Sequence, residues 1–246
     1  MMMGVQIVDI EAAREFSAMI AKQVSIEGQL MLERRLAERR TRILGLVARL
    51  SLAPAALSEL LGSFFGVRRH CQAILAEADR DVLVDGIQIA FSGAELPSVF
   101  ERISECGFHD QGLLRDLASE VLHCADPELH PLWRRWVLDP EQETGALALI
   151  VEDPTQLYGI DDDDTYGRVR FATEFLRQTL GAANTFPEPE ASPFAFDVFL
   201  SGVYGVYSAT VIKMRMTKEF NSLLPDLEEF MARILGVKGE RYASRG

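Results

Sequence analysis

The stretch LERRLAERRTRILGLVARL, from Leu32 to Leu50, decides the class of fold. Its apolar residues recur at spacings of three, four and seven, which places them on one face of an α-helix. The opposite face is rich in arginine. Upstream, Asp9 is a favourable N-cap, so the helical region begins there, either as one helix or as two that meet near Gly28. The apolar stripe consists of Leu32, Leu36, Ile43, Val47 and Leu50.

Short segments bounded by proline and glycine follow along most of the remaining chain. LAPAALSELLG has Pro54 near its first turn and Gly62 at its end, as helices often do. PELHPLWRRWVLDP also reads as a short helix. The predicted fold is therefore all-α, a mainly helical bundle. One small β-hairpin is expected near residues 82–91, because Asp85-Gly86 separates alternating apolar residues, although a helix through this pair is the alternative.

Changes of composition divide the chain into four segments. Residues 1–50 are expected to form an N-terminal helical arm, and residues 51–185 a helical core. Residues 186–193, FPEPEASP, hold three prolines in eight positions and are the best linker candidate. Residues 194–246 are expected to be C-terminal helices packed on the core. Their uncharged stretch Val198–Ile212 is shorter than the ~20 residues that span a bilayer, so we predict a buried central helix.

The composition favours a folded cytoplasmic protein. The chain has 246 residues, of which 48% are hydrophobic and 25% charged, and its net charge is −12. Such a chain can bury a real core. Cys71, Cys106 and Cys124 show no CxxC spacing, which fits reduced thiols. The N-terminus lacks a basic region followed by an apolar core, so we predict no signal peptide and no membrane association.

Basic residues are concentrated between Arg34 and Arg80, where nine arginines stand against four acidic residues. A basic face on an acidic protein suits a protein partner or a second copy of the chain, and aromatic side chains are expected to extend that surface. The predicted partner-binding residues are Arg34, Arg35, Arg39, Arg40, Arg42, Phe64, Phe65, Trp133 and Trp136.

The same region supports a nucleic-acid alternative. The order of helix, PAALSELLG helix, VRRHCQAIL helix and VLVDGIQIAF hairpin over residues 40–91 resembles a winged helix-turn-helix. The resemblance covers about fifty residues. It implies that the third helix enters the major groove of DNA with Arg68 and Arg69 near its start. The turn SFFG differs from the polar turn usual in that family.

Four consecutive aspartates, Asp161 to Asp164, precede another helical run. With Thr165, they match the DxDDT spacing of class II terpene cyclases, a resemblance of five residues that implies acid catalysis. A metal site is the second option, and a docking site for a basic partner is the third. The simplest interpretation is helix capping, since acids at a helix N-terminus stabilise it by ~0.3–1 kcal/mol each.

Glu120 and His123 form an ExxH pair, a spacing that two helices share in ferritin-like di-iron bundles. No second ExxH is present in the sequence. We therefore name no metal or catalytic site and expect no cofactor. The weak candidates for metal ligands are Glu120, His123, Asp161, Asp163 and Asp164.

The sequence contains no P-loop, GxGxxG or HExxH motif. The favoured hypothesis is a cytosolic helical protein–protein interaction or regulatory module, adaptor-like or chaperone-like, that forms homo-oligomers. The first alternative is a winged-helix transcriptional regulator with an acidic helical C-terminal domain. The second is a metal- or acid-dependent enzyme that uses Asp161–Asp164.

Overall fold

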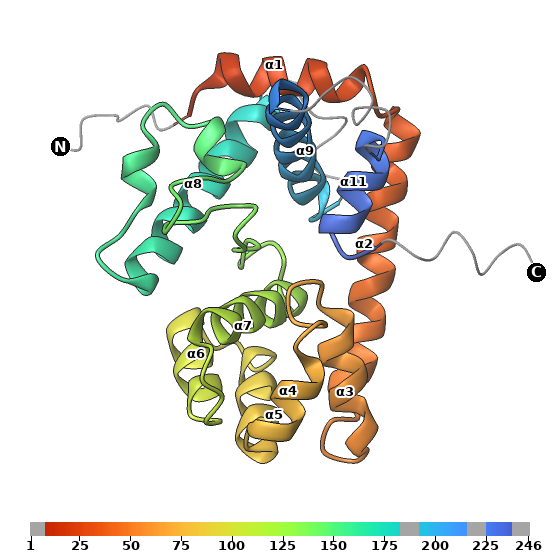
Figure 1. Cartoon of the computed structure of the whole chain (residues 1–246), viewed down its shortest axis with the longest axis vertical. Helices are drawn as coiled ribbons and strands as arrows, with labels where there is room; N and C mark the ends of the chain where they lie inside the picture. The colour runs from red at the N-terminus through yellow and green to blue at the C-terminus, as the bar shows by residue number, and fades with distance from the viewer. Residues whose placement is uncertain (1–7, 183–191, 216–224, 238–246) are drawn as a thin grey trace, which may run out of the picture. The chain divides into compact units, whose positions relative to one another are not determined.

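The computed structural model describes residues 8–182, 192–215 and 225–237, and within these ranges the fold is all-α, as predicted (Figure 1). The described residues form no strand. Their only extended pairings are two isolated bridges, Val8 with Val151 and Asp139 with Thr144.

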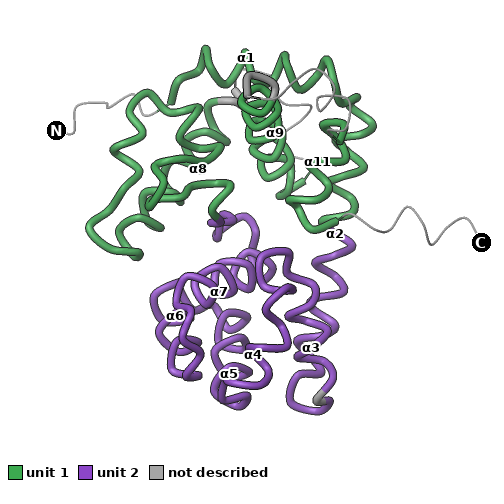
Figure 2. The backbone as a smooth tube through the Cα atoms, viewed as in Figure 1, with its two compact units in different colours: residues 1–36, 135–246 green, residues 37–134 purple. Residues whose placement is uncertain are grey.

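The chain divides into two compact units (Figure 2). Unit 1 comprises residues 1–36 and 135–246, and unit 2 comprises residues 37–134. These divisions fall at other places than the four predicted segments, and the predicted linker at 186–193 lies mostly outside the described residues.

The predicted helical region at the N-terminus forms two helices, α1 (Ile10–Ala21) and α2 (Ile26–Val47). Asp9 caps α1, because its Oδ1 accepts a hydrogen bond from the backbone N–H of Ala12 at 2.9 Å. Ser25 does the same for α2, since its Oγ accepts from the N–H of Gly28 at 3.1 Å. The break therefore lies at this serine cap, just before Gly28. The division between the two units falls within α2, after Leu36.

Unit 2 is built from the last part of α2 and five short helices, and α5, α6 and α7 pack on one another. Among its buried residues are Leu57, Leu83, Val99 and Leu117. The helices are α3 (Pro54–Ser63), α4 (Cys71–Glu77), α5 (Arg80–Ala90), α6 (Leu96–Ser104) and α7 (Gln111–Ala125).

The expected hairpin at residues 82–91 is wrong, because α5 continues through Asp85 and Gly86. The glycine serves helix packing and not a turn. A Cβ at Gly86 would lie 2.7 Å from Cγ1 of Ile103 and 3.0 Å from its backbone nitrogen. Only glycine lets α5 and α6 approach so closely, and this gain offsets the ~1 kcal/mol that glycine costs inside a helix.

Unit 1 holds α1, the first part of α2 and several later elements. Its central helix is α9, which includes the predicted apolar stretch Val198–Ile212. A Cβ at Gly202 would lie 2.6 Å from Ile20 of α1, and one at Gly205 would lie 2.5 Å from Leu227 of α11. The later elements are η1 (Leu147–Leu149), η2 (Pro154–Leu157), α8 (Asp162–Ala182), α9 (Ala195–Arg215) and α11 (Leu227–Ile234).

By length and composition, α9 is the one helix in the described part of the chain that could cross a membrane, and 56% of its apolar window is buried inside the structure. A buried core helix meets the same criteria, and the contacts of Gly202 and Gly205 with α1 and α11 are those of a core helix.

The expected helix around Trp133 and Trp136 is absent, since residues 126–136 form turns and extended backbone. Pro127 and Pro131 lack the N–H groups that a helix needs. A side chain replaces part of the missing backbone pairing, because the N–H of Trp133 donates to Oγ of Ser119 at 2.8 Å.

Candidate functional site

The four aspartates form the start of α8. Asp161 is its cap, because Oδ1 accepts a hydrogen bond from the N–H of Asp164 at 2.8 Å. Asp162, Asp163 and Asp164 occupy the first turn, where the positive end of the helix dipole favours negative charge. The capping interpretation is therefore confirmed by the geometry.

Asp164 makes a bidentate ion pair with Arg168 one turn later, at 3.2 Å from Oδ1 to Nε and 3.0 Å from Oδ2 to Nη2. The hydrogen bond from Arg168 lowers the pKa of the Asp164 carboxyl, and the N–H of Ile160 adds to this effect. Arg168 also donates to the backbone oxygen of Gln156 at 3.1 Å, so it ties the start of α8 to η2. A catalytic acid needs a proton to give, and a depressed pKa removes it at neutral pH.

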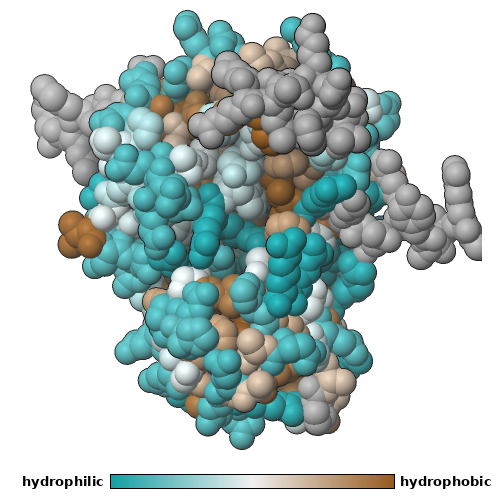
Figure 3. All heavy atoms as spheres, viewed as in Figure 1, coloured by the Kyte–Doolittle hydropathy of each residue, from teal (hydrophilic) through white to brown (hydrophobic). Residues whose placement is uncertain are grey.

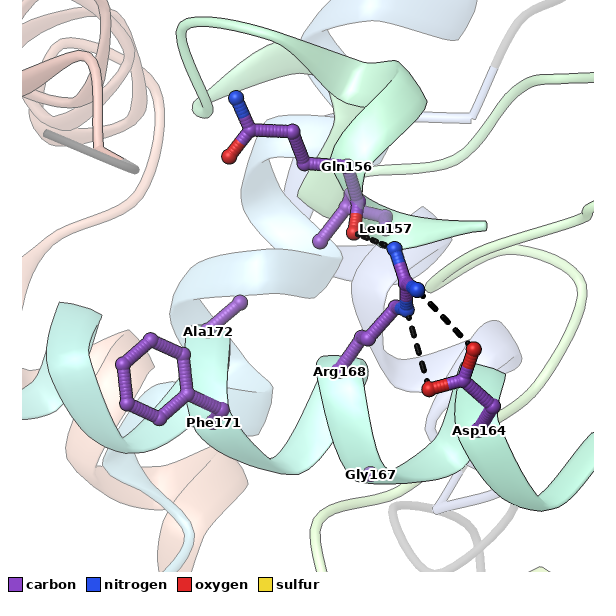
Figure 4. Close-up of a pocket in the computed structure, with 7 residues that line it drawn as sticks. All are labelled: Gln156, Leu157, Asp164, Gly167, Arg168, Phe171 and Ala172. Atoms are coloured by element: carbon purple, nitrogen blue, oxygen red, sulfur yellow. Dashed lines mark hydrogen bonds and ion pairs between the residues drawn. The ribbon is translucent and has the colours of Figure 1, made fainter. Parts of the chain in front are cut away.

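A pocket of about 330 Å³ opens beside this ion pair, between η2 and α8 (Figure 4). Leu157 and Ala172 are buried and form its apolar floor, while Arg168 and Asp164 close one end. The volume is at the lower end of the range for ligand pockets. The lining residues are Gln156, Leu157, Asp164, Gly167, Arg168, Phe171 and Ala172.

Gly167 gives this pocket its open side. It lies well inside α8, yet no neighbour in the described chain lies within 4 Å of the position that its Cβ would take. Helix packing therefore does not explain this glycine, which costs ~1 kcal/mol relative to alanine. Gly45 and Gly62 are equally open, but both lie in the last turn of their helices, where glycine is less costly.

Two large apolar side chains stand exposed near the pocket. Phe171 is 58% exposed and forms the wall beside Gly167, while its ring lies 6.4 Å from that of Phe175. Ile160 is 92% exposed, and its N–H donates to Oδ2 of Asp164 at 3.1 Å. In the view of Figure 3, most of the described surface is hydrophilic, with separate areas of hydrophobic residues. Exposed apolar groups beside a pocket are typical of a binding surface.

The predicted arginine face is only partly available to a partner. Arg34 and Arg42 are exposed and Arg35 is half-buried, whereas Arg39 is buried. Arg40 donates from Nε to the oxygen of Cys124 and from Nη2 to that of Ala125, at 2.8 Å each, which satisfies the end of α7. The arginines differ in exposure because α2 is long and its later part packs within unit 2.

The predicted aromatic surface is not exposed. Phe64, Trp133 and Trp136 are buried, and Phe65 is half-buried beneath the guanidinium groups of Arg68 and Arg134. Large aromatic side chains gain most from burial, so they fill the core here. Within unit 1, Trp136 packs near Tyr204, with ring centroids 6.4 Å apart. Phe64, Trp133 and Trp136 therefore do not form the partner surface that the sequence suggested.

Glu120 forms buried ion pairs with arginines, and this structural role replaces the metal-binding role considered from the sequence. It is 1% exposed, and its Oε2 lies 2.8 Å from Nη2 of Arg39. Its Oε1 lies 2.5 Å from Nη1 of Arg134, an ion pair at an angle unsuited to a hydrogen bond. Burial alone would raise the pKa of Glu120, but the attraction of Arg134 and Arg39 outweighs burial and lowers it. The carboxylate therefore stays ionised and joins α2, α7 and the segment before residue 135.

His123 likewise has an internal role. Its Nδ1 lies 2.8 Å from the backbone oxygen of His130, and because a carbonyl only accepts, Nδ1 carries the hydrogen. Across the described ranges, no three histidine, cysteine, aspartate or glutamate side chains are grouped as a metal ion would need. The ExxH pair and the aspartates are thus not brought together as ligands.

Comparison of the chain with protein-family models, with curated proteins and with solved structures gave no match.

The pocket on α8 is the feature that sequence reasoning missed. The available signal was TYGRVRF, where a glycine interrupts a helical run and an aromatic residue follows four positions later. Residues four apart lie on one helix face, so Gly167 and Phe171 had to be neighbours.

Proposed function

We propose that this protein is a cytoplasmic helical interaction module with a regulatory or adaptor role, and that it engages a protein partner through the α8 pocket. The observation that carries the proposal is Gly167, an open helix-interior glycine facing a pocket beside the exposed ring of Phe171. A partner side chain laid against the bare backbone at Gly167 would bury the exposed ring of Phe171 and lie over the pocket floor that Leu157 and Ala172 form.

The free energy of binding would come mainly from the apolar surface area that the partner buries. An exposed phenylalanine that becomes buried contributes ~1.5–3 kcal/mol, and each further apolar group adds ~25 cal/mol per Å². Such an anchor suits a regulated, reversible complex, because a single pocket and its rim lie at the small end of protein interfaces. Arg34 and Arg42 of α2 are also exposed.

The winged-helix alternative lacks its expected wing, because α5 occupies those residues. Two observations speak against the enzyme alternative: Asp161 caps α8, and Asp164 pairs with Arg168.

Glycine replacement tests the proposal cleanly. Gly167→Leu adds a side chain beside the pocket, and because its Cβ would have no described atom within 4 Å, the fold should persist and become slightly more stable. Gly45→Leu is the matched control, since it adds the same side chain at another open helix position. The full-length wild-type chain and both variants are used as bait in native lysate, and bound proteins are quantified.

Proteins retained by the wild type and Gly45→Leu, and lost with Gly167→Leu, support the proposal. If Gly167→Leu retains the same proteins in the same amounts, the pocket is not the interaction site.

A further inference from the structure

The chemistry of the partner can be inferred from the charges around the α8 pocket. Residues 152–177 hold seven acidic residues against three arginines. Arg168 pairs with Asp164, and Arg177 donates to the backbone oxygen of Pro193 at 3.3 Å and lies over the ring of Phe196. An excess of negative charge therefore surrounds an apolar pocket.

The acids lie on both sides of the pocket. Glu152 and Asp153 are exposed just before and at the cap of η2, and Asp153 joins the rim because the Gln156 side chain donates to its Oδ2 at 3.3 Å. Asp163 is exposed in the first turn of α8, one turn before Gly167. The hydrogen bond with Thr155 lowers the pKa of Asp153, so this carboxylate is charged at neutral pH.

From this arrangement we infer that the pocket takes a basic protein segment with one aromatic anchor, an inference that rests on the proposed function. The aromatic ring lies against the backbone at Gly167 and contacts Phe171, where ring edges and faces attract. Arginine or lysine residues on either side of the anchor reach the acids of η2 and of the first turn of α8. An acidic segment would meet like charges on both sides, which disfavours its binding.

Gly167 also gives the pocket selectivity for a flat side chain. Because the glycine has no Cβ, a planar ring can approach the helix backbone, while the ion pair of Arg168 and Asp164 blocks further extension along the groove. The anchor is therefore one aromatic residue and not a long apolar helix face.

Fluorescence anisotropy with dye-labelled heptapeptides tests the inference on the full-length chain. The probe is Gly-Arg-Arg-Phe-Arg-Arg-Gly, and two matched peptides replace either its phenylalanine by alanine or its arginines by glutamate. We expect the probe to bind wild type and Gly45→Leu equally, and to bind Gly167→Leu at least tenfold more weakly. Both matched peptides should bind wild type at least tenfold more weakly than the probe.

A double variant tests the charge directly. Asp162→Asn with Asp163→Asn keeps residues that are compatible with a helix start, so the helix should remain intact while affinity for the probe falls severalfold. Raising the salt concentration should weaken binding of the probe, because screening removes its attraction to the acidic residues. Binding of the glutamate peptide should stay unchanged or become slightly tighter, because screening removes repulsion.

The outcomes separate the two proposals. Equal binding of the glutamate peptide, equal binding of the alanine peptide, or no binding of the probe at millimolar protein overturns the inferred partner chemistry. If that happens while Gly167→Leu still loses its partners from lysate, the pocket remains an interaction site for a segment of other chemistry. If Gly167→Leu changes neither measurement, both proposals are wrong.

Discussion

Removal of the Glu120 carboxylate should cost unit 2 more stability than any other single polar substitution that the structure suggests. The two oxygens of Glu120 lie against arginines that are themselves buried, Arg39 at 2.8 Å and Arg134 at 2.5 Å. The side chains of the two arginines are 8% and 6% exposed. Glu120→Gln keeps the shape of the side chain and removes its charge, so two buried guanidinium groups lose this counter-charge.

The magnitude follows from this burial. Breaking a buried ion pair by removing one partner costs ~3–5 kcal/mol, because the remaining charge has lost its solvation. Two hydrogen bonds from Arg39 to the oxygen of Ser63, at 3.0 and 3.2 Å, survive and moderate the loss. We therefore expect a loss of about 3 kcal/mol, toward the lower end of that range.

Urea unfolding followed by circular dichroism measures this loss. Only unit 2 contains the cluster, so only the transition of unit 2 should shift. Glu229→Gln is the control, because its pair with Arg233 is solvent-exposed and worth ~0–1 kcal/mol. A triple replacement of Glu120, Arg39 and Arg134 by leucine and methionine should recover much of the stability. A loss below 1 kcal/mol for Glu120→Gln would refute the reasoning.

Four further outcomes are expected. The pKa of Glu120 is lower in the folded state than in the unfolded chain, where it is ~4.3. The stabilisation that ionised Glu120 gives to unit 2 is therefore complete above the unfolded-state pKa and is lost as the pH falls through the folded-state pKa. Acid unfolding of unit 2 should consequently be less steep in Glu120→Gln. Burial raises the pKa of Glu33, so Glu33→Gln should raise the melting temperature at pH 7 and leave it unchanged at pH 3.5. Gly205→Leu should destabilise unit 1 by ~1–3 kcal/mol in chemical denaturation, because a Cβ there already meets Leu227 at 2.5 Å. Asp161→Ala should cost ~1 kcal/mol in the same assay and Asp161→Asn almost nothing, since asparagine also caps.

Local patterns predicted the class of fold because they act over a few residues. The apolar stripe from Leu32 to Leu50 predicted the helix α2, and Asp9 predicted where the first helix starts. The aspartates at 161–164 were read as caps by the same local argument. Each of these features needs only the chain within one or two turns, which is the range over which the sequence is directly informative.

Other predictions failed because they depended on long-range contacts. Asp85-Gly86 has the local chemistry of a hairpin turn, but Gly86 is needed where α5 crosses Ile103, and no local pattern shows that partner. Trp133 and Trp136 were expected at the surface, and both fill the interior. The pairing of Glu120 with Arg39 spans 81 positions, so the sequence could suggest a metal site there and could not show its counter-charges.

The pocket could have been located in part. Gly167 and Phe171 lie on one face of a helix, and that much follows from their spacing. The contribution of η2, through Leu157 and the oxygen of Gln156, depends on how residues 150–161 fold back on α8. Gly159 helps to make that fold possible, because a Cβ there would lie 2.4 Å from the backbone nitrogen of Thr165.

Site-specific photo-crosslinking in intact cells tests the central claim most directly. A benzophenone amino acid in place of Phe171 puts the reactive group at the pocket wall, and the same group in place of Leu52, an 83% exposed residue of unit 2, is the control. We predict a discrete crosslinked protein at position 171, absent at position 52 and lost when Gly167→Leu is added. No crosslinked species at position 171, or the same species from both positions, would contradict the account.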